Sequence, residues 1–420
     1  MKNKSTSKRL WELLGIVAII TVIAFIGCSN PTGMETADGE GGSPSIQPGD
    51  DDDFKHPGGS PSGNTSDTYT ITFISTLKGN TEIDRQVVAN GGFIKEPDEP
   101  EESGMEFKGW IYQHAPTQQV IFKDGVAKGK VVDNMTLVAD WGTLGLLYDE
   151  DRIHDLTDEM VSIRGIQQNI DLATLVLPTF HNGNPVTTIK TGAFSRNPII
   201  QSVTIGANTA VIEKHAFGHA TSRDSALTDI TFVHDNTLKT IGEGAFQNTK
   251  LSSITIPASV TSIAEKAFSG ITNSLEVIFQ EDSKLVVIGI SAFEGSRLTK
   301  IEIPANVSNL RDRVFANTVL EEVSFASGSK VTVIPEHAFS KSKVQRVTLP
   351  NELKSIARYA FEDANNLKKI DIPSGSKVGA YAFTGWGSDQ EISIPMSESD
   401  TYTKWDTAWY SGSNARIKTR

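Results

Sequence analysis

A phenylalanine returns at a nearly constant interval through the second half of the sequence, usually with Ala directly before it. Successive copies lie 22 to 29 residues apart, and an aliphatic residue stands five positions before each of them. The copies are Phe194, Phe217, Phe246, Phe268, Phe293, Phe315, Phe339, Phe361 and Phe383. A repeat of this length predicts a solenoid, because one coil cannot bury its apolar side alone and neighbouring coils must cover each other.

The stretch "LSSITIPASVTSIAEKAFSG" (residues 251–270) shows the plan of one coil. Its first half alternates apolar and polar residues, which is typical of a half-buried strand with Ile254 and Ile256 facing inward. Pro257 has no N–H to extend a β-ladder, so we expect the strand to end there. The second half turns the chain back and places Phe268 in the same core. The predicted fold class is therefore mainly β.

The phrases "L-x-x-I-x-I-P" and "V-T-x-I-x-x-x-A-F" recur over residues 172–395 and resemble the BspA-type leucine-rich repeat. The resemblance implies a leucine-rich-repeat solenoid with a cap at each end. Residues 175–194 resemble the family's opening phrase, and a hairpin before them would form the first cap. The tail, 399–418, is similar to the closing cap, whose tryptophans would cover the last coil. The resemblance also implies adhesion to host matrix proteins, host cells or other bacteria.

A second pattern lies before the repeats. Residues 69–75 alternate apolar residues with threonines, and an acidic Pro-rich loop, "FKGW" (Phe107–Trp110) and "NMTLVADW" (Asn134–Trp141) follow. Together these blocks resemble the internalin-type B-repeat, also called the Listeria–Bacteroides repeat, which implies a β-grasp-like module on a bacterial surface. We interpret Trp110 and Trp141 as core residues; a sugar-binding platform is the alternative.

The N-terminus has the pattern of a secretion signal. Lys2, Lys4, Lys8 and Arg9 precede a run of apolar residues that ends just before Cys28, the single cysteine of the chain. This pattern resembles a bacterial lipoprotein signal. It implies removal of residues 1–27, acyl groups on Cys28 that bind the membrane, and a lipid-anchored protein exposed on the outer membrane. The alternative is an uncleaved membrane anchor with an incidental cysteine.

Composition completes the predicted domain organisation. Residues 28–68 are rich in Gly, Ser, Pro and Asp and contain few large apolar side chains, which predicts a disordered acidic tether. The B-repeat would then occupy 69–142 and the solenoid with its caps 143–420. The chain carries a net charge of −12 and has no long basic stretch, which argues against a nucleic-acid partner.

Motifs of enzyme chemistry do not occur in the sequence. G-x-S-x-G, HExxH and C-x-x-C are all absent, so we expect no catalytic activity and no cofactor. His215 and His219 are four residues apart and could hold a metal on a helix. His215 and His337 share a variable repeat position before Ala-Phe, however, and we favour an exposed repeat position over a metal ligand.

The candidate binding residues lie between the inward-facing aliphatic residues of the strands. They form a predicted outward row, namely Thr204, Thr231, Thr255, Glu302, Ser324, Thr348 and Asp371. Threonine also simply suits a half-exposed strand, which is the alternative interpretation. With the flanking Lys300, Arg346 and Lys369, the row is predicted to bind a protein or glycan on a host or bacterial surface. Glycan capture would favour exposed aromatics in the row, where the sequence shows none; a purely structural envelope protein remains a further alternative.

Overall fold

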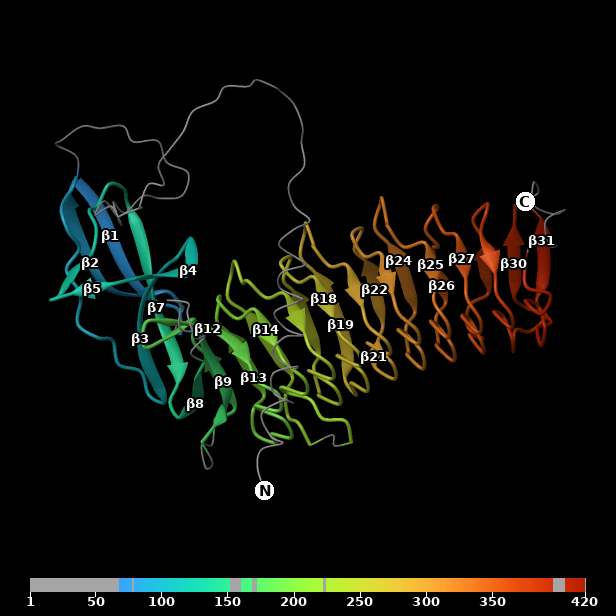
Figure 1. The fold of residues 1–420 in the computed structure, drawn as a ribbon, viewed down its shortest axis with the longest axis horizontal. Coiled ribbons are helices and arrows are strands. Elements are labelled where there is room, and N and C mark those ends of the chain that lie inside the picture. Colours follow the sequence, from blue (N-terminus) through green and yellow to red (C-terminus); the bar gives the residue numbers. More distant parts are fainter. Residues whose placement is uncertain are drawn as a thin grey trace, which may run out of the picture. The chain divides into compact units, whose positions relative to one another are not determined.

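The computed structural model describes residues 68–77, 79–151, 160–167, 172–221, 224–395 and 405–419. Every regular element in these ranges is a β-strand, so the predicted mainly-β fold is confirmed (Figure 1). Within the same ranges there is no helix that could span a membrane. The predicted signal peptide, most of the tether and Cys28 lie outside the described residues.

A five-stranded sheet forms the region that resembles the B-repeat. In order across the sheet its strands are β2 (Thr81–Ala89), β1 (Thr68–Ser75), β7 (Met135–Thr143), β3 (Met105–Tyr112) and β4 (Ala115–Val120). The central pair β1 and β7 is parallel, and β5 (Phe122–Lys123) and β6 (Val126–Ala127) form a separate small hairpin. Trp110 and Trp141 are almost fully buried, and the Trp110 ring lies 4.9 Å from that of Phe73. Their predicted role in the core is confirmed.

The longer strand of each coil stacks in parallel on the next one. One sheet contains β10 (Thr174–Leu177), β13 (Ser202–Ile205), β15 (Asp229–Phe232), β17 (Ser253–Ile256), β19 (Ser274–Phe279) and β21 (Arg297–Leu298). Two three-stranded sheets follow, formed by β22 (Lys300–Ile303), β24 (Glu322–Phe325) and β26 (Arg346–Val347), then by β28 (Lys369–Asp371), β30 (Glu391–Ile394) and β31 (Arg416–Thr419). The strand β17 ends directly before Pro257, as predicted.

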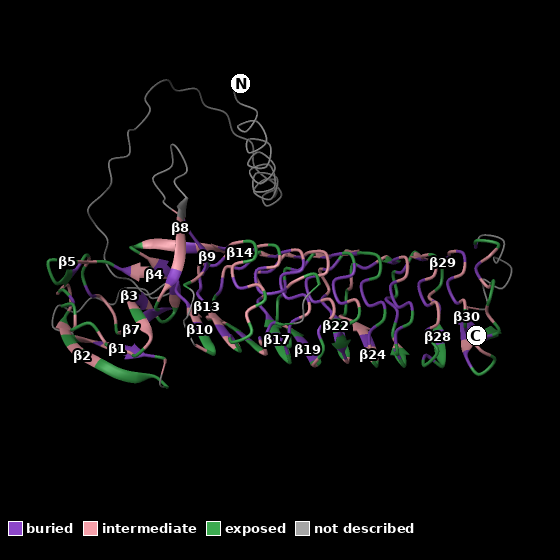
Figure 2. Cartoon of the chain, turned by 90° about the horizontal axis from the view of Figure 1, so that it is seen from below, coloured by how far each residue is buried: buried purple, intermediate pink, exposed green. Residues whose placement is uncertain are grey.

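Short strands run along the opposite side of the coils (Figure 2). Most belong to one parallel series, namely β9 (Met160–Ile166), β12 (Asn184–Ile189), β14 (Val211–Ile212), β16 (Thr240–Ile241), β18 (Ser262–Ile263), β20 (Val287–Ile288) and β23 (Asn309–Leu310). The rest are β25 (Val333–Ile334), β27 (Ser355–Ile356) and β29 (Lys377–Val378). The strand β8 (Leu146–Asp151) pairs antiparallel with β9 and forms the expected hairpin, and β11 (Phe180–His181) pairs with β12.

The repeated phenylalanines form one stack through the core. Neighbouring rings are nearly parallel, with centroids 5.1 to 5.7 Å apart. Burial of each ring contributes roughly 4 to 6 kcal/mol of apolar transfer free energy. At the last coil Trp386 and Trp409 pack edge-on against Phe383, and Trp405 packs against Trp409. The tryptophans of the tail therefore cover the end of the core, as the family resemblance implied.

The residue two positions before each phenylalanine adopts a left-handed backbone conformation. Its φ lies between 50° and 68° in all nine copies. Only Gly192 and Gly244 are glycines there, while His215, His337 and others take the same conformation. The sequence predicts an exposed position, but both histidines are half-buried, because His215 contacts the Gly244 carbonyl and His337 stacks on Tyr359, both in the next coil. The described residues contain no cluster of three metal-ligating side chains.

Candidate binding surface

The outward row lies on the long-strand side of the coils. Strand register places Thr204 beside Thr231, Glu302 beside Ser324, and Thr255 beside Ile278. All seven predicted residues point away from the core. Thr204 and Ser324 are half-buried, and the others are exposed. Neighbouring parallel strands are about 4.8 Å apart, so the row offers one side chain at each such step. In Figure 2 this side of the coils is largely green, meaning exposed.

The sequence pattern does not identify every residue at the register position of the row. Ile278 occupies the outward position of β19, and 46% of it is exposed. In the strand "SLEVIF" the first leucine stands one position later than in the other coils. The sequence pattern therefore did not reveal that Ile278 is equivalent to Thr255. The alternation within this strand could have identified Ile278, because Leu275 and Val277 face inward on either side of the outward Glu276. The row is therefore interrupted by an exposed apolar side chain.

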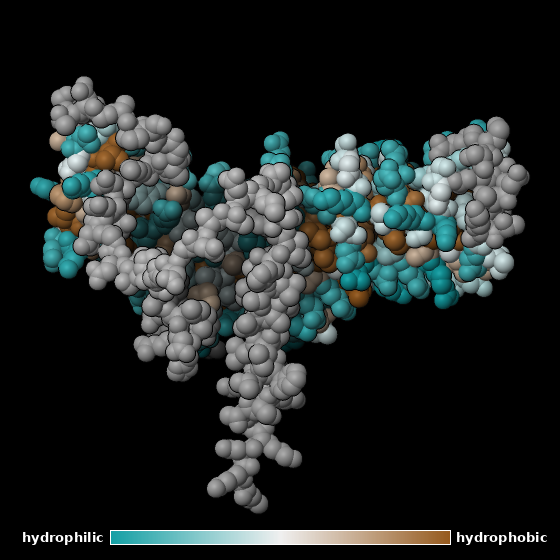
Figure 3. Space-filling view, turned by 45° about the horizontal axis from the view of Figure 1, so that its top comes forward, coloured by the Kyte–Doolittle hydropathy of each residue, from teal (hydrophilic) through white to brown (hydrophobic). Residues whose placement is uncertain are grey.

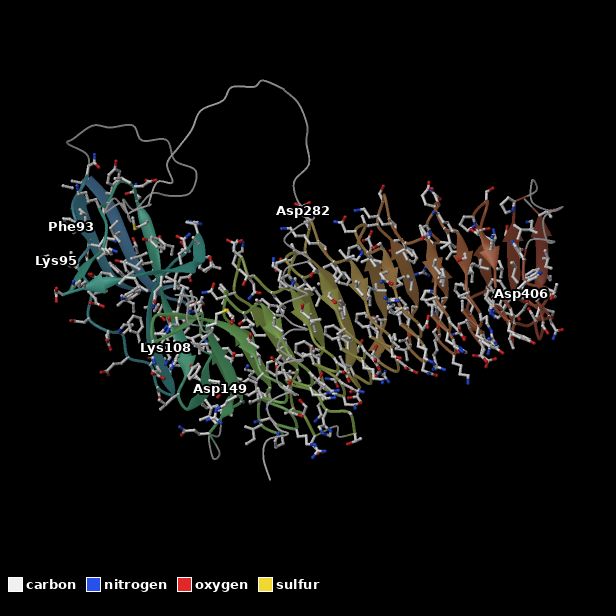
Figure 4. The ribbon with its side chains drawn as sticks, viewed as in Figure 1. Phe93, Lys95, Lys108, Asp149, Asp282 and Asp406 are labelled. Carbon is white, nitrogen blue, oxygen red and sulfur yellow. The ribbon has the colours of Figure 1, made fainter. Side chains whose placement is uncertain are left out.

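A hollow of about 1050 Å³ opens around Ile278. Its walls include Phe279, Lys300, Glu302 and Asp282, the last of which is labelled in Figure 4. The ladder of backbone hydrogen bonds explains the hollow. The strand β19 pairs with the next coil only through the two residues of β21, and β22 then begins a new sheet. The ladder of backbone hydrogen bonds is therefore interrupted on this face beside Ile278. Figure 3 views the coils from the other side, which carries the short strands; there, hydrophobic residues, in brown, lie between hydrophilic ones.

The three predicted cations flank the row, but each faces a carboxylate. Lys300 and Arg346 approach Glu322 of the strand between them, at 3.6 and 3.2 Å. Lys369 lies 3.2 Å from Asp371 and 4.0 Å from Glu391. The hydrogen bond from Arg346, together with the charge of Lys300, lowers the pKa of Glu322. The flank is therefore a ladder of alternating charges and does not form a positive patch.

A buried carboxylate was not foreseen either. Asp140, on β7, is 6% exposed and accepts backbone hydrogen bonds from Thr179 (3.0 Å) and Phe180 (2.9 Å), which precede the second coil. Burial raises its pKa to about 6, although these hydrogen bonds and the charge of Lys108 act in the opposite direction. Lys108 itself is held between Glu106 and the Nδ1 atom of His181. No local sequence pattern identifies such a contact, because its partners are far apart in the chain.

Aromatic side chains do occur at the surface, but in a different row. His337, Tyr359 and Tyr381 stack with centroids 5.0 and 5.2 Å apart and planes within 9° of parallel. Arg358 lies over the Tyr359 ring at 5.1 Å. Each inner ring face is thus covered by a neighbouring ring. A sugar stacks on an open ring face, so this column offers little of the surface that glycan capture would use.

Stacked coils whose longer strands line one face define a solenoid of the kind that binds other molecules along an extended surface. Residues 187–321 and 310–407 match the BspA type leucine-rich repeat region, and residues 69–140 match the Listeria–Bacteroides repeat domain. The first family covers more than half of the chain. This protein therefore belongs to the BspA-type leucine-rich repeat family, as predicted.

Solved structures of similar proteins come from several bacteria. The pneumococcal vaccine antigen PcpA is 18% identical, covering 67% of this chain and 88% of its own, with a TM-score of 0.41. A leucine-rich cell surface protein from Faecalibacterium prausnitzii is 17% identical, covering 67% and 94%, with a TM-score of 0.31. A leucine-rich repeat protein from T. pallidum is 20% identical, covering 57% and 86%, with a TM-score of 0.33. No curated protein matches the sequence.

Proposed function

We propose that this protein is a lipid-anchored adhesin of the bacterial cell surface, which binds a protein ligand through the outward row. The observation that carries the proposal is the hollow around Ile278, where an exposed apolar side chain lies among Lys300 and Glu302. Apolar anchors surrounded by polar groups are typical of the centre of protein interfaces. The role is one of binding, with no catalytic step.

Family membership supports surface display. One structural relative is described as a cell surface protein and another as a vaccine antigen. For this chain, we propose that Cys28 carries acyl chains after residues 1–27 are removed. Each buried CH₂ contributes about 0.8 kcal/mol, so two or three chains hold a protein stably on a membrane. Residues 28–68 would then separate the binding modules from the lipid.

The anchor can be tested by replacing Cys28 with Ala in cells fed radiolabelled fatty acid. We expect label in the natural protein and none in the variant. Label that persists in the variant would refute lipidation at this residue, and label in neither protein would favour the uncleaved anchor. Digestion of intact cells with an added protease then tests surface exposure, because a protein facing the periplasm would survive.

The binding face can be tested with a panel of matrix proteins, bacterial surface proteins and glycans. The full chain is compared with Ile278→Asp and with Ile290→Asp, a matched control. Ile290 is 43% exposed in the same repeat but does not line the hollow. We expect Ile278→Asp to weaken protein binding about tenfold or more, since it places a charge at the contact centre, and Ile290→Asp to change little.

Three results would oppose the proposal. Equal binding by the two variants would remove the hollow from the interface. Binding to glycans alone would favour the nutritional alternative, in which the protein captures sugars. If the protein binds no member of the panel, a structural role in the cell envelope is favoured.

A further inference from the structure

The strand β2 is an open edge of the five-stranded sheet. Its nine residues pair on one side with β1, and no other strand among the described residues lies next to it. The edge of a sheet presents backbone N–H and C=O groups that can pair with another extended chain. Figure 2 colours much of this strand green, meaning exposed. The backbone of β2 is therefore accessible to a partner strand.

Apolar side chains gather at this same edge. The exposed fractions are 68% for Val87, 53% for Phe93 and 38% for Ile83, and Val87 is the most exposed large hydrophobic residue among those described. These three residues line a groove of about 780 Å³ between β2 and residues 93–98. Soluble proteins seldom leave such contiguous apolar surface open without a function.

The loop on the far side of the groove, residues 93–98, is held to β2 by hydrogen bonds. The Gln86 side chain accepts a hydrogen bond from the Lys95 backbone N–H at 2.9 Å and donates one to the Lys95 carbonyl at 2.7 Å. It thus pairs with the loop in the way that a neighbouring strand would. Figure 4 shows Phe93 and Lys95 close together beside β2. Because both walls are held, a ligand would pay little entropy to order the site.

The charge around the groove selects the partner. Asp84, Glu96 and Asp98 line it, and Lys95 is the one cation among its described lining residues. Burial, together with the charge of the neighbouring Glu99, raises the pKa of Glu96. A basic ligand would relieve this repulsion. A second copy of β2 would instead bring its own Glu82 and Asp84 to these acids.

We propose that the groove beside β2 binds an extended segment of a partner protein, in which apolar residues alternate with Lys or Arg. The segment adds to the sheet as a new strand. Its backbone pairs with β2, its apolar side chains contact Val87 and Phe93, and its cations face Glu96 and Asp98. This site is separate from the outward row of the solenoid, so it stands or falls independently of the adhesin proposal.

The test uses two fluorescent peptides as long as β2, one alternating valine with lysine and one alternating valine with glutamate. Fluorescence anisotropy measures their binding to the full chain, to Val87→Ser and to the matched control Leu144→Ser. Leu144 is 56% exposed and lies outside the groove. We expect the lysine peptide to bind about tenfold more tightly than the glutamate peptide, and more weakly when salt is added. Val87→Ser should weaken it about threefold or more, and Leu144→Ser should not.

Hydrogen exchange provides a second measurement, in which the lysine peptide should protect the amides of β2 and leave those of the long solenoid strands unchanged. Several results would overturn the proposal. These are equal binding by the two variants, equal binding of the two peptides, or no binding at about 1 mM peptide. A concentration-dependent dimer that disappears in Val87→Ser would also overturn it, because the edge would then serve a second copy of the chain.

Discussion

Replacing Asp140 with Asn tests whether a buried charge connects the five-stranded sheet to the solenoid. The substitution keeps an oxygen that can accept from the Thr179 and Phe180 backbone N–H groups, but it removes the carboxylate. The natural protein and the variant should therefore respond differently to pH. The difference between them isolates this one group, because every other acid is present in both proteins.

The expected magnitude follows from the pKa of Asp140. Burial raises that pKa from 3.8 to about 6 in the folded protein. In the unfolded chain the carboxyl titrates near its ordinary value, so the folded state binds the proton more tightly. Its contribution to stability is fully present below about pH 4 and is lost as the pH rises through about 6. A rise of this size corresponds to about 3 kcal/mol.

Urea unfolding of the full chain, followed by tryptophan fluorescence, measures this difference. Trp141 lies next to Asp140 in the sequence and is buried, so it reports on this region. Between about pH 4 and pH 7, we expect the free energy of unfolding of the variant, relative to the natural protein, to increase by about 3 kcal/mol. Asp149→Asn is the matched control, since Asp149 is a half-exposed partner of Arg164 and should show no such increase.

A difference that stays flat across this pH range would refute the reasoning. It would mean that the carboxylate is solvated, or that its hydrogen bonds and Lys108 fully offset its burial. A difference in the free energy of unfolding that is the same at every pH would have another cause. It would reflect the side-chain amide of Asn, which brings an N–H group to a site arranged for an acceptor.

Three further substitutions test the packing of the coils. Phe293→Ala should lower the free energy of unfolding by about 3 to 5 kcal/mol, because the ring is fully buried between two other rings. Chemical denaturation measures this loss, and a value below about 1 kcal/mol would contradict the stacked core. Gly192→Ala should cost about 1 kcal/mol from its φ of 68° alone, since an added Cβ meets no atom within 4 Å; thermal unfolding measures this, and an unchanged melting temperature would exclude backbone strain there. Asn236→Ala should cost about 1 to 3 kcal/mol, because its side chain hydrogen-bonds Gly206 of the preceding coil; unchanged hydrogen exchange at Leu238, which donates to it, would count against this contact.

Much of the solenoid could be predicted because the apolar and polar pattern that defines each coil is local in the sequence and is repeated. The alternation around Ile254 and Ile256 indicates which side chains face inward, and the same pattern recurs in most coils. Burial of both residues confirms this prediction. Ile278 was missed where the phrase changed spacing, although its face follows the same rule. The left-handed position before each phenylalanine was also missed, because His215 and His337 do not have the glycine that usually marks such a turn.

The sequence by itself determined the repeat, most of its inward residues and the family, since side-chain alternation and period are properties of neighbouring residues. The tertiary structure decided what the outward face offers. Register between coils brings Glu322 to Lys300 and Arg346, so two of the cations predicted to flank the binding row are paired with a carboxylate. An interruption of the hydrogen-bond ladder between two coils lies beside the hollow at Ile278. Both depend on how one coil sits against the next, and a linear pattern does not specify distances across that contact.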